Sequence, residues 1–336
     1  MNRGRLFQRI GGARLAGIAL RLKAHMRPMW LTALAYHRVC EDDANSPWDT
    51  NLISATPEQF RRQLQFIKRY FSPITSQDIV AWSKGQFSMP PNSLVITFDD
   101  GYRDNHDVAL PLLQEAGVRA DFFVCPWHIE NRRLFWWDRI TFCLKRSAVS
   151  KIEMDYPERL ELDVGTVQNI EAARLTLVRM VKRRAEVGLG ALLLELERAS
   201  GAKLEERREA ERLVLSWADV RALRQAGMGV GSHSYSHPVL ALQDADVVRR
   251  EMEQSKAVLE AQLGEQVTAI AYPVGSFTDG TKAMAHDAGY ELGYSYCSGA
   301  SFLRSADLLE LKRVAIEKDM TFGHFKAVTA LPFWAH

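Results

Sequence analysis

The stretch LVITFDDGYRDN, residues 94–105, decides the fold class of this chain. Its first five residues form a short apolar run of the length and composition typical of a buried strand. Asp99 and Asp100 follow that run directly, and Gly101 permits a sharp turn after them. The pattern predicts a strand that ends in a loop bearing two carboxylates.

The same arrangement recurs along the chain. Short apolar runs at 31–36, 120–124, 228–232 and 269–272 each end at a polar residue or a proline. Helical patterns lie between them, among them a capping box at Thr56 to Gln59. Alternating strands and helices predict parallel strands in an α/β architecture. In an α/β barrel the loops at the carboxyl ends of the strands converge on one face, where chemistry is built.

Three parts of the chain fall outside that alternation. Residues from about 131 to 215 are rich in Arg, Glu and Leu and mostly helical in pattern, so we expect a helical insertion between two strands. Residues 1–30 form a basic amphipathic N-terminal segment, and residues 321–336 a C-terminal tail. The remaining region, 31–320, is expected to be the barrel.

Charge and composition exclude some classes. The net charge of the 336 residues is only +2, which gives no electrostatic case for nucleic-acid binding. Residues 1–28 hold seven basic residues and no acidic one, so they could contact an anionic membrane surface or form a solvated helix. Arginines interrupt each candidate signal peptide, no apolar run is long enough to span a membrane, and the four cysteines form no CxxC pair. We therefore expect a cytoplasmic protein, with membrane association through residues 1–28 left open.

A second motif, GSHSYSHP at residues 231–238, supports a functional interpretation of the two aspartates. Alone, Asp-Asp-Gly is often a surface turn, and a single histidine is more often structural than a ligand. Two histidines four residues apart, His233 and His237, can face one metal ion. One carboxylate with two imidazoles is the open pattern of a catalytic zinc site, so we predict Zn²⁺ or another divalent transition metal.

These motifs are similar to those of the polysaccharide deacetylase family, also called the NodB-homology family. The resemblance rests on ITFDDGYRDN, VALPLLQEAGVRADFFV, LSWADVRALRQAGMGVGSHSYSHPVL and AIAYPVGSF. It implies a distorted (β/α)7-type barrel and the removal of N-acetyl groups from amino sugars. It also implies that Asp99 is the catalytic base and that Asp100, His233 and His237 bind the metal.

The chain departs from the family pattern at two places. Many members carry an arginine that orients the base, where this chain has Ala271. The segment from Tyr272 through Pro273 to Gly275 resembles the Tyr-Pro-x-Gly motif of an exopolysaccharide and surface-glycan branch, so these three residues are expected to shape the substrate groove. The late Leu-x-His motif that supplies the family's general acid is not evident. His37 is the better candidate for that acid, with a structural histidine as the alternative.

Two further residues have open roles. Trp137 lies in an aromatic cluster, which could stack on a sugar ring or belong to the core. Arg313 could support the active site or merely pair with a carboxylate.

The leading hypothesis is a metal-dependent hydrolase that removes N-acetyl groups from a polysaccharide or glycan precursor in cell-surface or exopolysaccharide biosynthesis. Its substrate partner would be an N-acetylated glycan. One alternative is a non-catalytic, glycan-binding barrel. The other is a different metal-dependent amide or ester hydrolase; a magnesium phosphoesterase fits less well, because magnesium prefers oxygen ligands.

Overall fold

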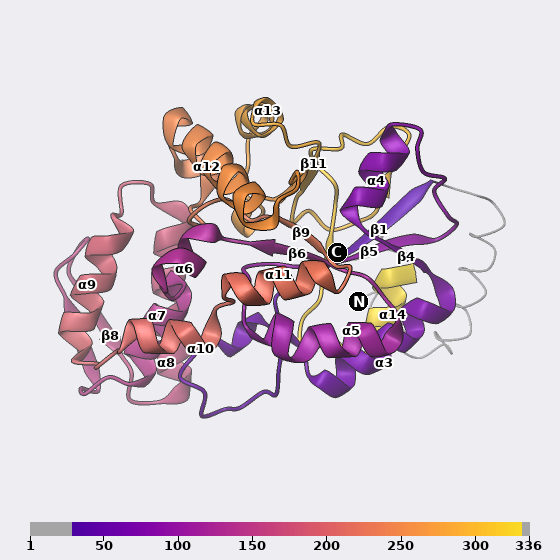
Figure 1. Ribbon diagram of the computed structural model, residues 1–336. Coiled ribbons are helices and arrows are strands. Elements are labelled where there is room, and N and C mark those ends of the chain that lie inside the picture. The colour runs from indigo at the N-terminus through magenta and orange to yellow at the C-terminus, as the bar shows by residue number, and fades with distance from the viewer. Residues whose placement is uncertain (1–28, 331–336) are drawn as a thin grey trace, which may run out of the picture. The chain divides into compact units, whose positions relative to one another are not determined.

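The structure is a computed structural model that describes residues 29–330. The described chain forms two compact units (Figure 1). One comprises residues 29–41, 51–126 and 215–330, and the other comprises Asp42–Thr50 and Trp127–Val214. Residues 1–28 of the predicted basic segment 1–30 and residues 331–336 of the predicted tail lie outside the described residues.

The first unit is built on one curled sheet. Its strands follow in the order β11 (Leu292–Tyr294), β10 (Ala269–Ala271), β9 (Gly229–Ser232), β6 (Asp121–Val124), β5 (Ser93–Phe98), β1 (Trp30–Tyr36) and β12 (Ser301–Phe302). In addition, β4 (Ser72–Ile74) pairs with β5, and β13 (Val314–Ala315) pairs with β1. These neighbours run parallel, whereas β12 runs antiparallel to β1. The predicted distorted (β/α)7-type barrel is confirmed.

The register of the sheet brings the carboxyl ends of its strands to one edge. Tyr36 of β1 pairs with Phe98 of β5, and Val124 of β6 pairs with Ser232 of β9. The residue that follows each strand therefore enters a loop at the same edge. A short parallel pair, β2 (Arg38–Val39) with β3 (Ile53–Ala55), continues from β1.

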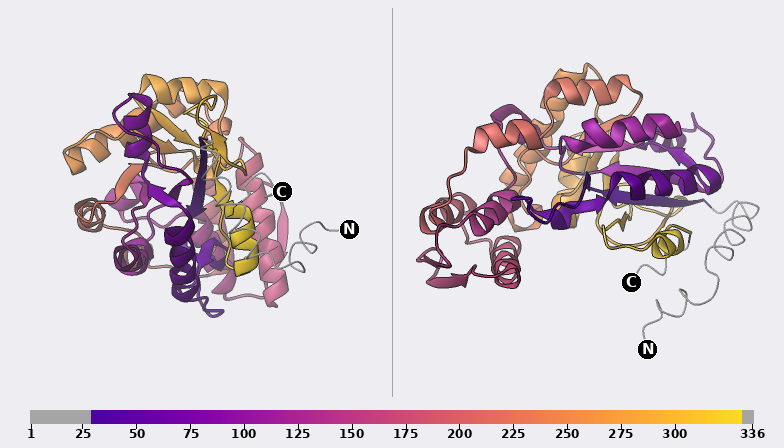
Figure 2. Two further views of the ribbon diagram at one scale, coloured as in Figure 1. Left: turned by 90° about the vertical axis from the view of Figure 1, so that its right-hand side faces the viewer. Right: turned by 90° about the horizontal axis from the view of Figure 1, so that it is seen from below.

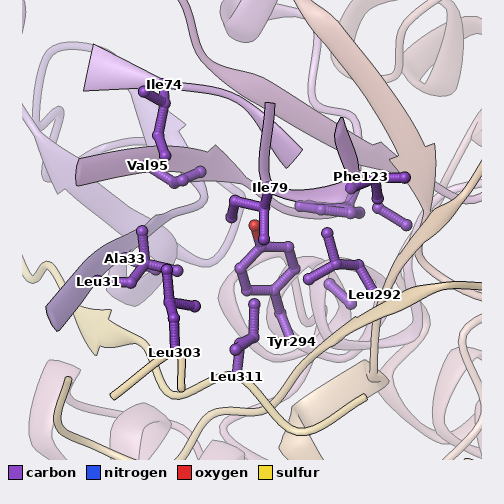
Figure 3. Close-up of a cluster of buried hydrophobic side chains, with 13 residues drawn as sticks. Leu31, Ala33, Ile74, Ile79, Val95, Phe123, Leu292, Tyr294, Leu303 and Leu311 are labelled. Carbon is purple, nitrogen blue, oxygen red and sulfur yellow. The ribbon is translucent and has the colours of Figure 1, made fainter. Parts of the chain in front are cut away.

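Apolar side chains fill the inside of the curl. Alternate residues of a strand share one face, which is how Leu31 and Ala33 of β1 join Val95 of β5 and Phe123 of β6 in one buried cluster. Figure 3 shows Tyr294 at the centre of the labelled side chains. Each fully buried aliphatic side chain contributes roughly 1.5–3 kcal/mol, so this cluster holds the strand ends in place.

Helices flank the sheet on the outside of the first unit. They are α3 (Pro57–Tyr70), α4 (Ser76–Ser83), α5 (Leu110–Ala116), α11 (Trp217–Gln225), α12 (Ala245–Leu263), α13 (Asp279–Asp287) and α14 (Phe322–Ala330). Single turns occur at η1 (Thr50–Leu52), η3 (Leu240–Leu242) and η4 (Pro273–Gly275), and a π-helical turn, η2 (Asn105–Ala109), precedes α5. The predicted capping box is confirmed: Thr56 and Gln59 exchange hydrogen bonds of 3.2 and 2.8 Å at the start of α3.

The last described helix packs onto the barrel. Phe325 of α14 is fully buried, and its ring centroid lies 6.0 Å from that of Phe66 in α3. Figure 2 shows the yellow α14 beside the indigo α3. The predicted C-terminal tail therefore begins with a packed helix. In residues 29–330, no helix is both long and apolar enough to span a membrane.

The second unit is a small helical body with one hairpin. Its helices are α6 (Pro126–Asn131, which starts one residue before the unit), α7 (Trp136–Lys145), α8 (Val167–Arg183), α9 (Leu189–Ser200) and α10 (Glu206–Leu213). The hairpin joins β7 (Lys151–Met154) to β8 (Leu160–Asp163), which the sequence pattern did not predict. Arg174 Nη1 donates to Asp49 Oδ2 across 3.0 Å and so ties the short segment Asp42–Thr50 to α8.

Candidate metal centre

Three side chains of the kind that bind metals meet at the carboxyl edge of the sheet. Asp100 follows β5, and His233 and His237 follow β9; one ligand atom from each lies within 4.8 Å of the others. Asp100 Oδ1 lies 3.5 Å from His233 Nε2 and 3.4 Å from His237 Nε2. All three side chains are buried. The structure thus brings together the residues that the two sequence motifs singled out.

The surroundings of Asp100 fit a bound cation. Both of its carboxylate oxygens are buried, and within the described part of the chain neither has a hydrogen-bond partner. Burial alone would raise the pKa of Asp100, but the imidazoles of His237, His37 and His233 hold it well below its usual value. An ionised, buried and unpartnered carboxylate is costly, and a divalent ion would satisfy it. The donor set of one carboxylate and two imidazoles suits catalytic zinc.

His233 is held in the form that binds a metal. Its Nδ1 lies 2.7 Å from the carbonyl oxygen of Ala271. A carbonyl oxygen only accepts, so Nδ1 carries the proton and the lone pair of Nε2 faces Asp100. Burial lowers the pKa of His233 to about 4, which keeps the ring neutral at pH 7. A neutral imidazole is the ligand form.

The loop that carries the two histidines is fixed by serines and a buried glutamate. Ser234 N donates to Ser232 Oγ across 3.1 Å, and His237 N donates to Ser234 Oγ across 3.1 Å. Glu251 of α12 accepts from Ser236 N across 2.8 Å and from Ser236 Oγ across 2.5 Å. Ser234 and His237 have φ angles of 59° and 61°. These hydrogen bonds therefore maintain a backbone conformation that L-residues rarely adopt.

Asp99 stands beside the triad and pairs with a buried arginine. Arg313 Nη1 donates to Asp99 Oδ1 across 2.7 Å and to Thr97 Oγ1 across 3.0 Å, and Arg313 Nε donates to the Ser295 carbonyl across 3.0 Å. Asp99 Oδ2 lies 4.0 Å from His233 Nε2. Burial would raise the pKa of Asp99, but Arg313 and His233 outweigh it and lower that pKa. Asp99 is therefore ionised at neutral pH and able to accept a proton.

Arg313 pairs with Asp99 from a distant part of the chain, while Ala271 occupies the sequence position where an arginine was expected from the family resemblance. The side chain of Arg313 is almost fully buried. Its guanidinium lies 5.8 and 5.7 Å from the ring centroids of Tyr294 and Tyr296. Of the two roles left open for Arg313, pairing with a carboxylate is observed, and that carboxylate is Asp99. Support of the active site stays a prediction.

His37 follows β1 at the same edge. Its backbone N donates to Ser54 Oγ across 2.9 Å, and its carbonyl accepts from Asn105 Nδ2 across 2.8 Å. Its ring centroid lies 6.0 Å from that of Tyr296. The backbone of His37 is therefore fixed on both sides. Its role as general acid stays a prediction.

The Tyr-Pro-x-Gly segment, expected to shape the substrate groove, is largely packed into the protein. Tyr272 is buried and donates its hydroxyl to the Leu309 carbonyl across 2.9 Å, and Pro273 is also buried. Gly275 has a φ of 65°, and a Cβ added there would lie 2.3 Å from the Cβ of Tyr296. Gly275 thus permits the close approach of Tyr296. Substrate contact by the three motif residues stays a prediction.

Trp137 lies in the second unit, on α7. It is 7% exposed, and its ring stacks on Phe135 at a centroid distance of 4.7 Å and an interplanar angle of 8°. Trp136 meets it edge-on at 5.1 Å. This packing is typical of a core aromatic residue. A sugar contact by Trp137 stays a prediction that the described contacts do not test.

Two residues at the site were not singled out from the sequence. Glu251 falls on the apolar face of its helix, between Val248 and Ser255, so a charged residue on a buried stripe was the available signal. Tyr296 lies in the loop after β11 and belongs to no recognisable motif. Only the folded chain places it against His37 and Arg313.

A curled parallel barrel with a buried carboxylate–imidazole–imidazole triad at its carboxyl edge defines the class: an α/β-barrel protein with a candidate mononuclear metal centre. Residues 87–293 match the family model for polysaccharide deacetylase, and the chain belongs to this family. The matched range includes both aspartates and both histidines. It leaves out His37 and Arg313, which the fold adds to the site.

Known proteins give similarity at two levels. YxkH of Bacillus subtilis (strain 168), assigned to the polysaccharide deacetylases, is 28% identical over 113 residues, which cover 34% of this chain and 40% of that protein. The match thus spans less than half the length of that curated relative. The deacetylase PplD of Streptococcus pyogenes, solved with acetate, shares the fold with a TM-score of 0.60 at 21% identity, over 91% of this chain and 100% of that chain. IcaB of Ammonifex degensii shares it with a TM-score of 0.56 at 19% identity, over 91% and 97%.

Proposed function

We propose that this protein is a metal-dependent N-deacetylase that removes N-acetyl groups from the amino sugars of a polysaccharide or glycan precursor. The observation that carries this proposal is the contrast between two adjacent buried carboxylates. Asp99 is bonded to Arg313, whereas Asp100 faces two imidazoles and has no hydrogen-bond partner among residues 29–330. One carboxylate is therefore suited to a proton and the other to a cation. Family membership supplies the reaction class.

Asp100, His233 and His237 would hold Zn²⁺ or another divalent transition metal. Such an ion would polarise an acetyl carbonyl and would make a nearby water more acidic. Asp99 accepts the proton that the attacking water loses. Because Arg313 occupies Oδ1 of Asp99, the proton is received at Oδ2, the oxygen closer to His233.

The C–N bond of the amide breaks when the nitrogen gains a proton. His37 is the proposed donor of that proton, since it lies at the same edge of the sheet and its backbone is fixed by Ser54 and Asn105. The water oxygen ends in acetate, and the sugar keeps a free amine. A second proton-active group is needed because the base and the acid act on different atoms.

We infer that the substrate belongs to cell-surface or exopolysaccharide biosynthesis. The support is the Tyr-Pro-x-Gly segment at Tyr272 to Gly275, which resembles that branch of the family. The expected substrate is an N-acetylated glycan.

The test is acetate release from N-acetylglucosamine oligomers by purified protein, first stripped with a chelator and then reloaded with Zn²⁺. Wild-type protein should release acetate only when reloaded, and Asp99→Asn should lose most of that activity while still binding the metal. Reloaded wild type that releases no acetate from any N-acetylated glycan would refute the proposal. Full activity in Asp99→Asn would refute the assignment of the base.

A further inference from the structure

We propose that Tyr296 forms a stacking surface for the pyranose ring that carries the N-acetyl group, an inference that rests on the proposed function. The large apolar side chains exposed in the described part of the chain are Val149, Val167, Leu194 and Tyr296. The first three belong to the second unit. Tyr296 belongs to the first, is aromatic and is 38% exposed. A partly exposed aromatic ring beside a buried polar site offers a face on which a ligand can stack.

The ring of Tyr296 lies near His37 and near Arg313, the partner of Asp99. The guanidinium of Arg313 lies 5.7 Å from the ring centroid, and this guanidinium donates to Asp99 across 2.7 Å. The ring of His37 also lies near it, with a centroid distance of 6.0 Å and an interplanar angle of 55°. A sugar ring resting on the exposed part of Tyr296 therefore lies close to both Asp99 and His37.

The backbone that carries Tyr296 is held in place. Its Cβ occupies the space that a side chain at Gly275 would need. Ser295 N donates to the Leu311 carbonyl across 2.9 Å, and the Cys297 carbonyl accepts from Arg313 N across 3.1 Å. A rigid aromatic side chain with few rotatable bonds loses little conformational entropy when a ligand stacks on it.

The chemistry of this surface selects the ligand. An aromatic ring gains from contact with the apolar C–H face of a sugar, while the hydroxyl groups of the sugar stay in water. The nearby carboxylate and imidazole suit an uncharged amide at C2 as the reacting group. The proposed ligand is thus the pyranose ring of a neutral N-acetylated amino sugar.

The experiment measures binding of a tetramer of N-acetylglucosamine by calorimetry in a metal-loaded Asp99→Asn background, which prevents turnover. Tyr296→Ala and Tyr296→Leu should each raise Kd about three- to tenfold, and Tyr296→Trp should stay within about twofold. Leu194→Ala, which removes another exposed apolar side chain, serves as the matched control. A Tyr296 that only shields the Arg313–Asp99 pair would not change Kd here, because that carboxylate is already replaced.

Each outcome separates this inference from the proposed function. An unchanged Kd in both Tyr296→Ala and Tyr296→Leu overturns the inference, even if wild-type protein releases acetate. A raised Kd in both supports it, even if wild-type protein releases none. Absence of tetramer binding at millimolar concentration overturns it. The Leu variant keeps apolar bulk, so it answers the question if the Ala variant fails to fold.

Discussion

Arg313 holds Asp99 across 2.7 Å although 214 residues separate them in the chain. The pair is almost fully buried, with side-chain exposures of 0% and 2%. A buried carboxylate without its partner is strongly destabilising, by about 3–5 kcal/mol. Arg313 therefore keeps Asp99 ionised and sets which of its oxygens is available.

Replacing Arg313 by Met should move the acid limb of the kcat/KM profile to higher pH. Asp99 must be ionised to act as a base, and Arg313 is a main cause of its lowered pKa. Without Arg313, burial dominates and raises the pKa of Asp99. As the pH is lowered, the variant should therefore lose activity at a higher pH than wild type does. Rates measured from pH 4 to 8 test this. Arg207→Met, at an exposed arginine, is the control; an unshifted acid limb in Arg313→Met would contradict the assignment.

Loss of any one triad residue should abolish stoichiometric metal binding. Wild-type protein should carry about one divalent ion per chain by elemental analysis. Asp100→Asn, His233→Ala and His237→Ala should lose it without unfolding, and asparagine is chosen because it tolerates the φ of 73° at Asp100. His286→Ala, at an exposed histidine outside the triad, should keep the ion. If every triad variant still carried about one ion per chain, the metal would bind at another site.

Glu251→Ala should weaken metal binding without removing a ligand. Glu251 accepts both polar hydrogens of Ser236, next to His237 in the loop. Groups that orient ligands typically change metal affinity about 10- to 100-fold. Competition with a chelating dye measures the affinity, and Glu253→Ala, at an exposed position on the same helix, is the control. Equal metal affinities in the two variants would mean that the loop carrying His237 keeps its conformation without Glu251.

Gly275→Ala should cost more stability than Gly264→Ala. Both glycines have φ near +70°, which costs an alanine about 1–2 kcal/mol. A Cβ at Gly264 meets nothing within 4 Å, whereas a Cβ at Gly275 would lie 2.3 Å from the Cβ of Tyr296. The thermal midpoint should therefore fall several degrees further in Gly275→Ala. Equal thermal midpoints in the two variants would show that the loop around Tyr296 can move to accommodate the added Cβ.

Asp121→Asn should change how stability depends on pH. Asp121 accepts from Ser76 N and Oγ across 2.7 and 2.6 Å, and burial raises its pKa to about 6. The folded state therefore holds this proton more tightly than the unfolded state, so wild-type stability from this group falls as pH rises from about 4 to 6. Asparagine removes that dependence. The thermal midpoint of the variant minus that of wild type should be higher at pH 7 than at pH 4.5, and a constant difference would contradict the raised pKa.

The features that could be predicted from the sequence are those formed by residues close together in the chain. The strand at 93–98 and its two aspartates are adjacent residues, and the spacing of His233 and His237 shows in one loop. Parallel alternation then implies that the loops meet at one edge, which the register confirms. Family membership follows from the same local motifs.

What could not be predicted depends on contacts between distant residues. Nothing near Arg313 indicates Asp99 as its partner, because the pairing arises from β13 lying beside β1 and β1 beside β5. The motif at Tyr272 does not indicate that the hydroxyl of this residue donates to the distant Leu309 carbonyl. The exposed ring belongs to Tyr296, whose position depends on the backbone of Gly275.

The larger part of the second unit, Trp127–Val214, lies in the chain between β6 and β9, and so between Asp100 and the two histidines. A ribosome that adds about 5–20 residues per second needs roughly 7–27 s to pass from Asp100 to His237. Until His233 and His237 have been synthesised, the two neighbouring carboxylates have no imidazole to face, and Arg313 is made later still. Because Asp100 is synthesised well before both histidines, an ion can be held by all three ligands only after His237 has been made.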